Sequence, residues 1–274
     1  MSVTSAGGSI VLVGAGNMGG AMLSGWLDKG VSGESVTVLT RTSLSETIAA
    51  KLSAAGGRHV NAPPEGLVAD ILFLAVKPQM MDVALPPLTS LVGDNTVIVS
   101  VAAGKTLAYF ASQLGDRAMV RAMPNTPSMI GRGVTGAFAN PRVTDAQREA
   151  VDQLLRASGP VEWVATESDI DAVTAVSGSG PAYVFYLVEC MAEAGRKLGL
   201  PADLAMRLAR ETVSGAGELL NRSAEDAAQL RKNVTSPNGT TAAALSVLMA
   251  EDGIQPVFDK AIAAARRRAE ELGS

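Results

Sequence analysis

The sequence predicts an α/β fold with a doubly wound parallel sheet at the N-terminal side and an all-α region after it. Up to about Val164, short runs of valine, isoleucine and leucine alternate with helix-like stretches, which is the pattern of strands covered by helices. Beyond Glu167 this strand signal stops, and alanine, leucine, glutamate and arginine recur at helical spacing. We therefore expect two domains, residues 1–166 and residues 167–274.

The expected strands are nearly continuous apolar runs, as is typical of parallel strands that are buried on both faces. They are Ile10 to Val13, Val36 to Leu39, Ile71 to Val76, Val97 to Val101 and Met119 to Met123, with weaker candidates at Val134 to Ala139 and Val161 to Val164.

Prolines and glycines mark the expected helix ends in the second half. Pro181 begins a helix that Gly199 ends, and Pro201 begins the next, in keeping with the preference for proline at helix starts and glycine at helix ends. The remaining signals are a break at Thr235 to Gly239, a helix starting near Thr240, and a final helix with Pro256 in its first turn and Arg266 to Arg268 at its end.

Several of these helical stretches carry almost no charge on any side. Val173 to Val176, Tyr183 to Val188 and Ala242 to Leu248 are nearly all apolar or small. A helical bundle of about 100 residues has too little interior to bury so much apolar surface. We therefore expect an all-α C-terminal dimerisation domain and a homodimer or higher homo-oligomer.

Composition excludes several classes of protein. With 47% hydrophobic and 18% charged residues the chain is too apolar to be disordered, and a formal net charge of −4 does not favour nucleic-acid binding. One cysteine cannot form an internal disulfide. No basic residue precedes Lys29, so no secretory signal is expected, and no apolar run is long enough to span a membrane. We expect a cytoplasmic protein that acts on a small molecule.

A glycine-rich motif, GAGNMG, follows the first expected strand. Gly14 suits a tight turn, Gly16 lets the backbone approach a pyrophosphate, and Gly19 allows close helix packing. The amides of Asn17 and Met18, at the start of the following helix, would face the anion. A structural turn is the alternative, but the strand and helix on either side favour a Rossmann-type dinucleotide-binding domain.

The residues after the second strand predict which dinucleotide is preferred. Thr40, Arg41, Thr42 and Ser43 provide a guanidinium and three hydroxyls where an acidic residue would select NAD. This favours NADPH, with NADH possible, unless Arg41 is only a solvated loop residue. Two further loops should meet the same sheet edge, the first at Lys77 and the second at Ala102 to Gly104.

The remaining reactive side chains offer little conventional chemistry. His59, the sole histidine, is expected in a loop or short edge strand away from the cofactor edge, and Cys190 is expected to be buried and inert. No metal-ligand spacing is present, so no metal is expected. Because a protonated imine is already electrophilic, the lack of an obvious general acid favours a C=N substrate over a carbonyl.

The break in the helical half, NVTSPNGTT, spans Asn233 to Thr241. Its hydroxyls and exposed amides could hold a carboxylate at a helix N-terminus. From the residues alone, a simple turn with Ser236 or Thr240 capping the next helix is the better interpretation.

Six segments in order, GAGNMGGAM, FLAVKPQ, SVAAG, RAMPNTP, AVSGSGPAY and LRKNVTSPNGTTAAAL, resemble the pyrroline-5-carboxylate reductase family over essentially the whole chain. The resemblance implies NAD(P)H-dependent reduction of L-1-pyrroline-5-carboxylate to L-proline, the last step of proline biosynthesis. It also implies a Rossmann domain, a helical dimerisation domain, and dimers often assembled into rings of five.

The resemblance also implies roles for individual residues. Ser236, Gly239, Thr240 and Thr241 would hold the substrate carboxylate, with Thr241 as a proposed proton donor, and Glu167 matches an acidic position near the substrate. The cofactor positions that it implies are Gly14, Gly16, Asn17, Met18, Gly19, Thr40, Thr42, Val76, Lys77, Ala103 and Asn233, in addition to Arg41 and Ala102 from the loops described above. Asn238 replaces the glycine that many members have before Gly239.

Other functions remain open at this point. Another imine reductase or a 3-hydroxyacid dehydrogenase would use the same architecture, but no lysine among Lys197, Lys232 and Lys260 has a convincing catalytic setting. A non-catalytic NADP-binding sensor is a third alternative, although a sensor would not need a carboxylate site.

Overall fold

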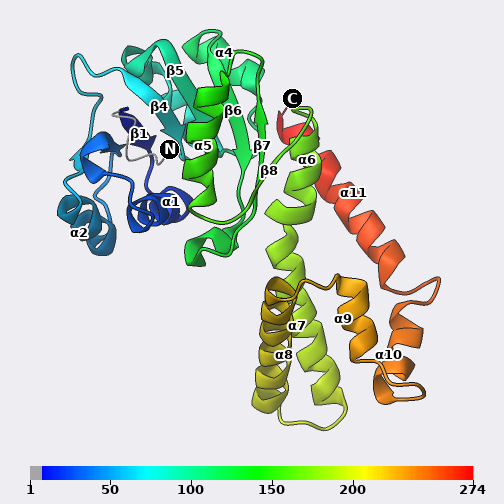
Figure 1. Ribbon diagram of the computed structural model, residues 1–274. Helices are drawn as coiled ribbons and strands as arrows, with labels where there is room; N and C mark the ends of the chain where they lie inside the picture. Colours follow the sequence, from blue (N-terminus) through cyan, green and yellow to red (C-terminus); the bar gives the residue numbers. More distant parts are fainter. Residues whose placement is uncertain (1–7, 274) are drawn as a thin grey trace. The chain divides into compact units, whose positions relative to one another are not determined.

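The computed structural model describes residues 8–273, which fall into two compact units. The first comprises residues 8–178 together with 266–273, and the second is Ser179–Ala265 (Figure 1). By contacts, the division therefore falls after Gly178, within the helical part of the chain. The domain boundary at residue 166 stays a prediction.

An eight-stranded sheet forms the centre of the first unit, in the order β3-β2-β1-β4-β5-β6-β7-β8. All neighbours are parallel except β6 and β7. The strands are β1 Ile10–Val13, β2 Val36–Leu39, β3 Arg58–Val60, β4 Ala69–Leu74, β5 Val92–Ser100, β6 Ala118–Met123, β7 Thr135–Ala139 and β8 Val161–Trp163. Each predicted strand is present, and the doubly wound fold is confirmed.

Two buried clusters cover the two faces of this sheet. On one face Trp26 of α1 (Asn17–Asp28) meets Phe73 edge-on at 5.1 Å, and its indole nitrogen donates to the Leu154 carbonyl of α5 (Asp145–Arg156). Helix α2 (Glu46–Ala54) adds Leu52 there. The other face is covered by α3 (Met81–Ala84), α4 (Leu107–Leu114) and short 3-10 turns.

The first unit also contains helical segments from later in the chain. Helix α6 (Asp169–Val173) runs into a π-helical turn, Thr174–Gly178, and the end of α11 (Ile254–Gly273) returns to the loop after β5. Gly104, at φ +69°, lies so close to Leu272 that a Cβ there would be 2.7 Å from the leucine Cβ. The last turns of the chain therefore complete the packing of the first unit.

The second unit contains α7 (Gly180–Lys197), α8 (Ala202–Arg222), α9 (Ala227–Asn233), α10 (Thr240–Leu248) and the start of α11. Pro181 in the first turn of α7, Gly199 at φ +99° after it, and Pro201 before α8 act as predicted.

Two helices, α8 and α9, lie between Pro201 and the predicted break at Thr235, and Asp226 caps the second by accepting from the Gln229 amide at 2.7 Å. One predicted helix end was wrong. The final helix does not end at Arg266 to Arg268. It continues to Gly273, where Ala269 is buried and Leu272 lies against Gly104, and Arg266 and Arg268 form exposed ion pairs with Glu270 and Glu271 one turn further on.

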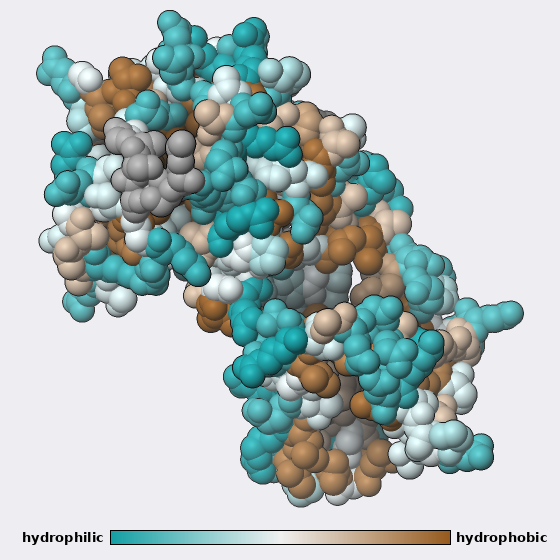
Figure 2. Space-filling model, in the orientation of Figure 1, coloured by the Kyte–Doolittle hydropathy of each residue, from teal (hydrophilic) through white to brown (hydrophobic). Residues whose placement is uncertain are grey.

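The second unit buries very little of its own apolar surface. Its only buried hydrophobic residues are Ala192, Ala205 and Ala209, all in a segment that the structure describes completely. Hydrophobic residues are visible instead on its outside (Figure 2). The exposed fraction of Phe185 in α7 is 63%. Cys190 is also exposed in the single chain, so the expectation of a buried thiol was wrong for this state.

Among residues 8–273, the search for bilayer-spanning helices finds none with the required length and apolar character.

Candidate functional site

The glycine motif forms the turn between β1 and α1, and glycine is favoured at each of its three positions for a different structural reason. Gly14 has φ +90° and donates its amide to the Leu39 carbonyl at 2.9 Å. A Cβ on Gly16 would meet nothing within 4 Å, so this backbone is open to a ligand. A Cβ on Gly19 would collide with the Gly14 carbonyl oxygen. The turn therefore fits a bound pyrophosphate, as the motif predicts.

Gly16 is also the N-cap of α1, where it supplies no side-chain acceptor, and the first turn carries no acidic residue. The amides of Asn17 and Met18 therefore begin the helix without an intrahelical partner. Such amides and the helix dipole attract an anion.

A cavity of about 300 Å³ lies at the carboxyl ends of β2 and β3. It is lined by Arg41, Thr42, Ser43, His59, Val60 and Asn61. The predicted cofactor residues Arg41 and Thr42 thus share a pocket, and Thr40 lies beside it through a 2.8 Å contact between its Oγ1 and His59 Nε2. The expectation that His59 lies away from the cofactor edge was wrong, because β3 pairs directly with β2.

The other predicted cofactor residues of the first unit lie along the same sheet edge. Val76, after β4, packs close to Gly14, since a Cβ added to Gly14 would be 2.8 Å from the Cγ1 of Val76. Lys77 is exposed and caps the short helical turn that follows. Ala102 is buried after β5, next to the half-buried Ala103. The sheet order brings these loops together at the switch point between β1 and β4.

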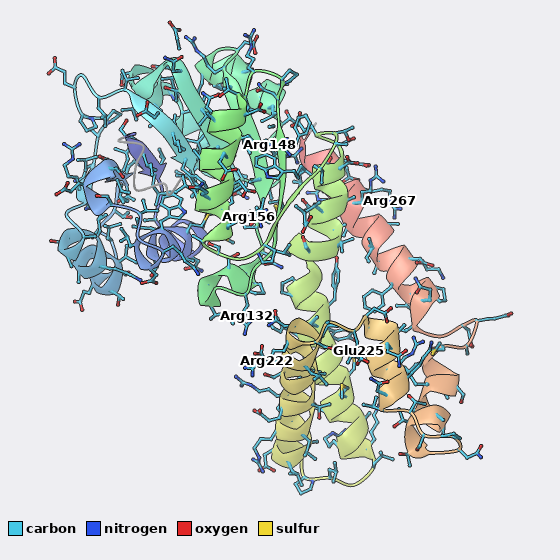
Figure 3. The ribbon with its side chains drawn as sticks, viewed as in Figure 1. Arg132, Arg148, Arg156, Arg222, Glu225 and Arg267 are labelled. Carbon is cyan, nitrogen blue, oxygen red and sulfur yellow. The ribbon has the colours of Figure 1, made fainter. Side chains whose placement is uncertain are left out.

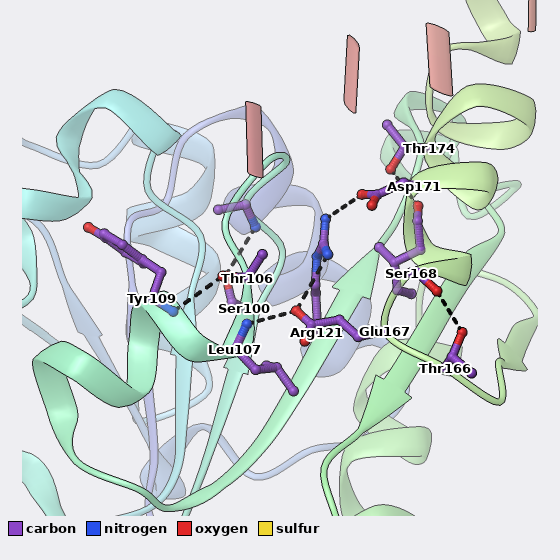
Figure 4. Close-up of polar contacts among 12 residues, drawn as sticks. Ser100, Thr106, Leu107, Tyr109, Arg121, Thr166, Glu167, Ser168, Asp171 and Thr174 are labelled. Carbon is purple, nitrogen blue, oxygen red and sulfur yellow. Dashed lines mark hydrogen bonds and ion pairs between the residues drawn. The ribbon is translucent and has the colours of Figure 1, made fainter. Parts of the chain in front are cut away.

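Glu167 joins a network around Arg121, which is only 3% exposed (Figure 4). One oxygen of Glu167 accepts the Leu107 amide at the start of α4 at 2.7 Å, and lies 3.5 Å from the guanidinium. Asp171 pairs with the same guanidinium at 2.8 Å. Sequence reasoning missed Arg121, because a lone arginine in an apolar strand gave no signal for its partners.

The segment Asn233 to Thr241 begins at the end of α9 and ends in the first turn of α10. Asn233 donates to Glu225 at 2.8 Å and accepts from Gln229 at 2.7 Å, and Glu225 is labelled in Figure 3. Asn238 adopts the left-handed conformation at φ +57°, and Gly239 donates its amide to the Ser236 carbonyl at 3.1 Å.

Helix α10 starts without a side-chain cap. Its N-cap is Gly239, and no side chain accepts from its first amides. The interpretation of Ser236 or Thr240 as a simple cap was therefore wrong, although the turn at Pro237 to Gly239 is present. Ser236 and Thr240 are exposed and Thr241 is half-buried. The arrangement leaves amides and hydroxyls together at a helix N-terminus, where a carboxylate can bind.

The predicted site residues thus form two groups. One lies along the sheet edge of the first unit, and the other, Asn233 to Thr241, belongs to the second unit. Within the described part of the chain, no three His, Cys, Asp or Glu side chains are grouped as a metal site would require.

Fold and site together define an oxidoreductase that binds a nicotinamide dinucleotide. A family model described as pyrroline-5-carboxylate reductase dimerisation matches residues 167–272, and one described as NADP oxidoreductase, coenzyme F420-dependent, matches residues 9–104. A pyrroline-5-carboxylate reductase from Pseudomonas aeruginosa is 39% identical over 96% of both chains. The chain belongs to the pyrroline-5-carboxylate reductase family.

Solved structures agree with this assignment. A pyrroline-5-carboxylate reductase from Coxiella burnetii superposes with a TM-score of 0.89 at 35% identity, covering 97% of this chain and 99% of that one. A pyrroline carboxylate reductase from Plasmodium falciparum, solved with NADP bound, gives a TM-score of 0.79 at 26% identity, covering 97% and 98%.

Proposed function

We propose that the chain reduces the C=N bond of L-1-pyrroline-5-carboxylate to give L-proline, the last step of proline biosynthesis, with NADPH as the preferred reductant. The observation that carries this proposal is the uncapped start of α10, which follows the turn at Ser236 to Gly239. A helix start left open in this way suits a small anionic substrate, in a chain that also carries a dinucleotide loop.

The cofactor residues divide the dinucleotide between them. Gly14, Gly16, Asn17, Met18 and Gly19 would hold the pyrophosphate. Thr40, Arg41 and Thr42 would hold the 2′-phosphate of NADPH, because a guanidinium and hydroxyls suit a phosphate. The other residues expected to contact the cofactor are Val76, Lys77, Ala102, Ala103 and Asn233. NADPH, when bound, supplies the hydride.

The substrate residues would fix the carboxylate and orient the ring. Ser236 and the amides of Gly239 and Thr240 would hold the carboxylate. The Thr241 hydroxyl would donate to the ring nitrogen of the neutral imine, or accept from its N–H once the imine is protonated and so orient the ring. Since a protonated imine is already electrophilic, most of the rate enhancement would come from orientation.

Glu167 would lie near the substrate, with its second carboxylate oxygen as the group that can accept a hydrogen bond there. Its first oxygen already accepts the Leu107 amide and faces Arg121.

Replacing Thr241 by alanine tests the proposed catalytic residue. We expect kcat/KM to fall at least tenfold, because the hydroxyl that contacts the ring nitrogen is lost. Thr241→Ser, which keeps the hydroxyl, is the matched control and should retain most activity. A Thr241→Ala enzyme with unchanged kcat/KM would remove this residue from the mechanism.

The reaction itself is tested by NADPH oxidation at 340 nm with purified protein and L-1-pyrroline-5-carboxylate, repeated with NADH. We expect proline as the product and faster turnover with NADPH. Tight NADPH binding without turnover would favour another imine substrate or a sensor. Turnover of a 3-hydroxyacid instead would favour the dehydrogenase alternative.

We propose further that the chain works as a homodimer through its second unit, and that dimers assemble into decamers. The exposed apolar side chains of that unit support the dimer. Placement in the cytoplasm stays a prediction that rests on the single cysteine.

A further inference from the structure

We infer that His59 is a specificity-determining residue, whose protonated ring binds the 2′-phosphate of NADPH together with Arg41. This inference rests on the proposed use of NADPH and adds a residue and a pH dependence to it. The juxtaposition that carries it is the cavity of about 300 Å³ beside β2 and β3, which both side chains line.

The chemistry of the cavity lining suits a phosphate. Arg41 always carries a positive charge, His59 acquires one by protonation, and Thr42, Ser43 and Asn61 add hydrogen-bonding groups. No carboxylate is among the described residues that line it. The lining therefore places no negative charge, which would repel a bound anion, in this cavity.

The hydrogen bonds around Thr40 determine which nitrogen of His59 carries hydrogen. The Thr40 hydroxyl donates its one proton to the Thr42 carbonyl oxygen. It must therefore accept in its 2.8 Å contact with His59, so Nε2 is the donor. The neutral ring then has its lone pair on Nδ1, and protonation there turns this acceptor into a donor and gives the ring its charge.

The elements packed against β3 bring few competing charges to the imidazole. Strand β2, which pairs with it, has no ionisable residue. Helix α2 carries Glu46 and Lys51, and Lys51 is paired with Asp28 at 2.6 Å. Arg58 is the neighbour of His59 in β3, where successive side chains point to opposite faces. Arg41 remains the charged group that shares the cavity.

A positive charge on His59 should act on NADPH and leave NADH largely unaffected, because only NADPH carries a 2′-phosphate. For unit charges in contact through water, the expected gain in the affinity ratio is about fivefold. The ratio of NADPH to NADH affinity should therefore rise as the pH falls from 8.5 to 6.0, over the range in which histidines change charge.

The test is calorimetric titration of the full-length protein with NADPH and NADH at several pH values in this range, without substrate. His59→Gln is the matched variant, because a glutamine amide can still donate to Thr40 but cannot acquire a charge. The 2′-phosphate itself titrates near pH 6, and this contribution is the same for both proteins. We expect the wild-type ratio to exceed that of His59→Gln, by up to about fivefold, and the excess to be larger at pH 6.0 than at pH 8.5.

Two further variants keep the outcomes separate. His59→Arg has a permanent charge and should give an elevated ratio with the shallow pH profile of His59→Gln. Arg41→Asp should weaken NADPH more than NADH at every pH. Identical pH profiles for wild type and His59→Gln would overturn the role of His59, while the Arg41→Asp result would still report on the NADPH preference. If the wild-type protein binds neither NADPH nor NADH, both the proposed use of NADPH and the role of His59 are overturned.

Discussion

At the scale of single residues, the turn after β1 shows how three glycines serve three different needs. Gly14 needs a left-handed backbone, Gly16 leaves space open, and Gly19 allows its helix to approach the Gly14 carbonyl. The sequence motif predicts these roles because a pyrophosphate-binding turn constrains each position separately. The contrast between Gly16 and Gly19 can be tested directly.

Alanine at these two glycines should give opposite results. Gly19→Ala should lower the free energy of unfolding by more than about 2 kcal/mol, because the new Cβ collides with backbone. Gly16→Ala should leave it nearly unchanged but weaken NADPH binding, since the Cβ would enter open space that the pyrophosphate needs. Urea unfolding and calorimetric titration measure the two effects. Equal destabilisation by both changes would contradict this assignment.

A second residue-scale prediction concerns Arg121. Its guanidinium is 3% exposed and lies 2.8 Å from Asp171, which is itself only 13% exposed. Asp171→Ala should therefore lower the free energy of unfolding by about 3 kcal/mol, since it leaves a buried charge without this partner. Glu167→Gln should lower it by less than about 1 kcal/mol, because Glu167 is more exposed and its amide oxygen can still accept from Leu107. Urea unfolding would contradict this if the two losses were the same.

His59 shows what could not be predicted at this scale. The sequence RHV has one clearly apolar residue, so the short strand β3 gave only an ambiguous signal. Its pairing with β2, which places His59 opposite Val38 and beside Thr40, depends on contacts between segments that are 19 residues apart. Periodicity within one segment contains no information about such pairing.

At the scale of elements, strands were predicted better than helix ends. Strands such as β1 and β6 are apolar along most of their length, because they are covered on both faces. The end of α11 was misplaced because three consecutive arginines suit a helix terminus, yet here Arg266 and Arg268 pair with glutamates one turn further on. The last turns of α11 also bury Ala269 and place Leu272 against Gly104, contacts that the local charge pattern does not reveal.

The exposed face of α7 carries the prediction for assembly. Phe185 is 63% exposed in the single chain. If the dimer interface covers this position, Phe185→Lys places a charged side chain where it would be buried, which is costly. We expect Phe185→Lys to shift the protein from dimer to monomer in size-exclusion chromatography with light scattering. Ile130→Lys, which changes a 77% exposed residue of the first unit, is the control and should remain dimeric. A dimeric Phe185→Lys protein would place the interface elsewhere.

At the scale of the whole molecule, the two units differ in how they are stabilised. The first buries two large clusters against its sheet, whereas the second buries only three alanines within residues 179–265. Such a small interior cannot offset the entropy of ordering a helical domain. Association between chains would supply the missing burial.

This dependence on association predicts that thermal stability varies with protein concentration. A hundredfold increase in concentration should raise the Tm by roughly 5 °C, because binding between folded chains favours the folded state. Differential scanning calorimetry across that range measures the shift, with the Phe185→Lys protein as the comparison. A Tm that does not change with concentration would show that the second unit is stable in the single chain.

The position of Cys190 has a practical consequence. It is the one cysteine of the chain, and it is exposed on α7, the helix that the proposed dimer would cover. A thiol-reactive dye would then attach at one defined place, and only while two subunits are apart. The labelling rate would therefore report the rate at which the dimer dissociates. The native sequence would need no engineered cysteine for this measurement.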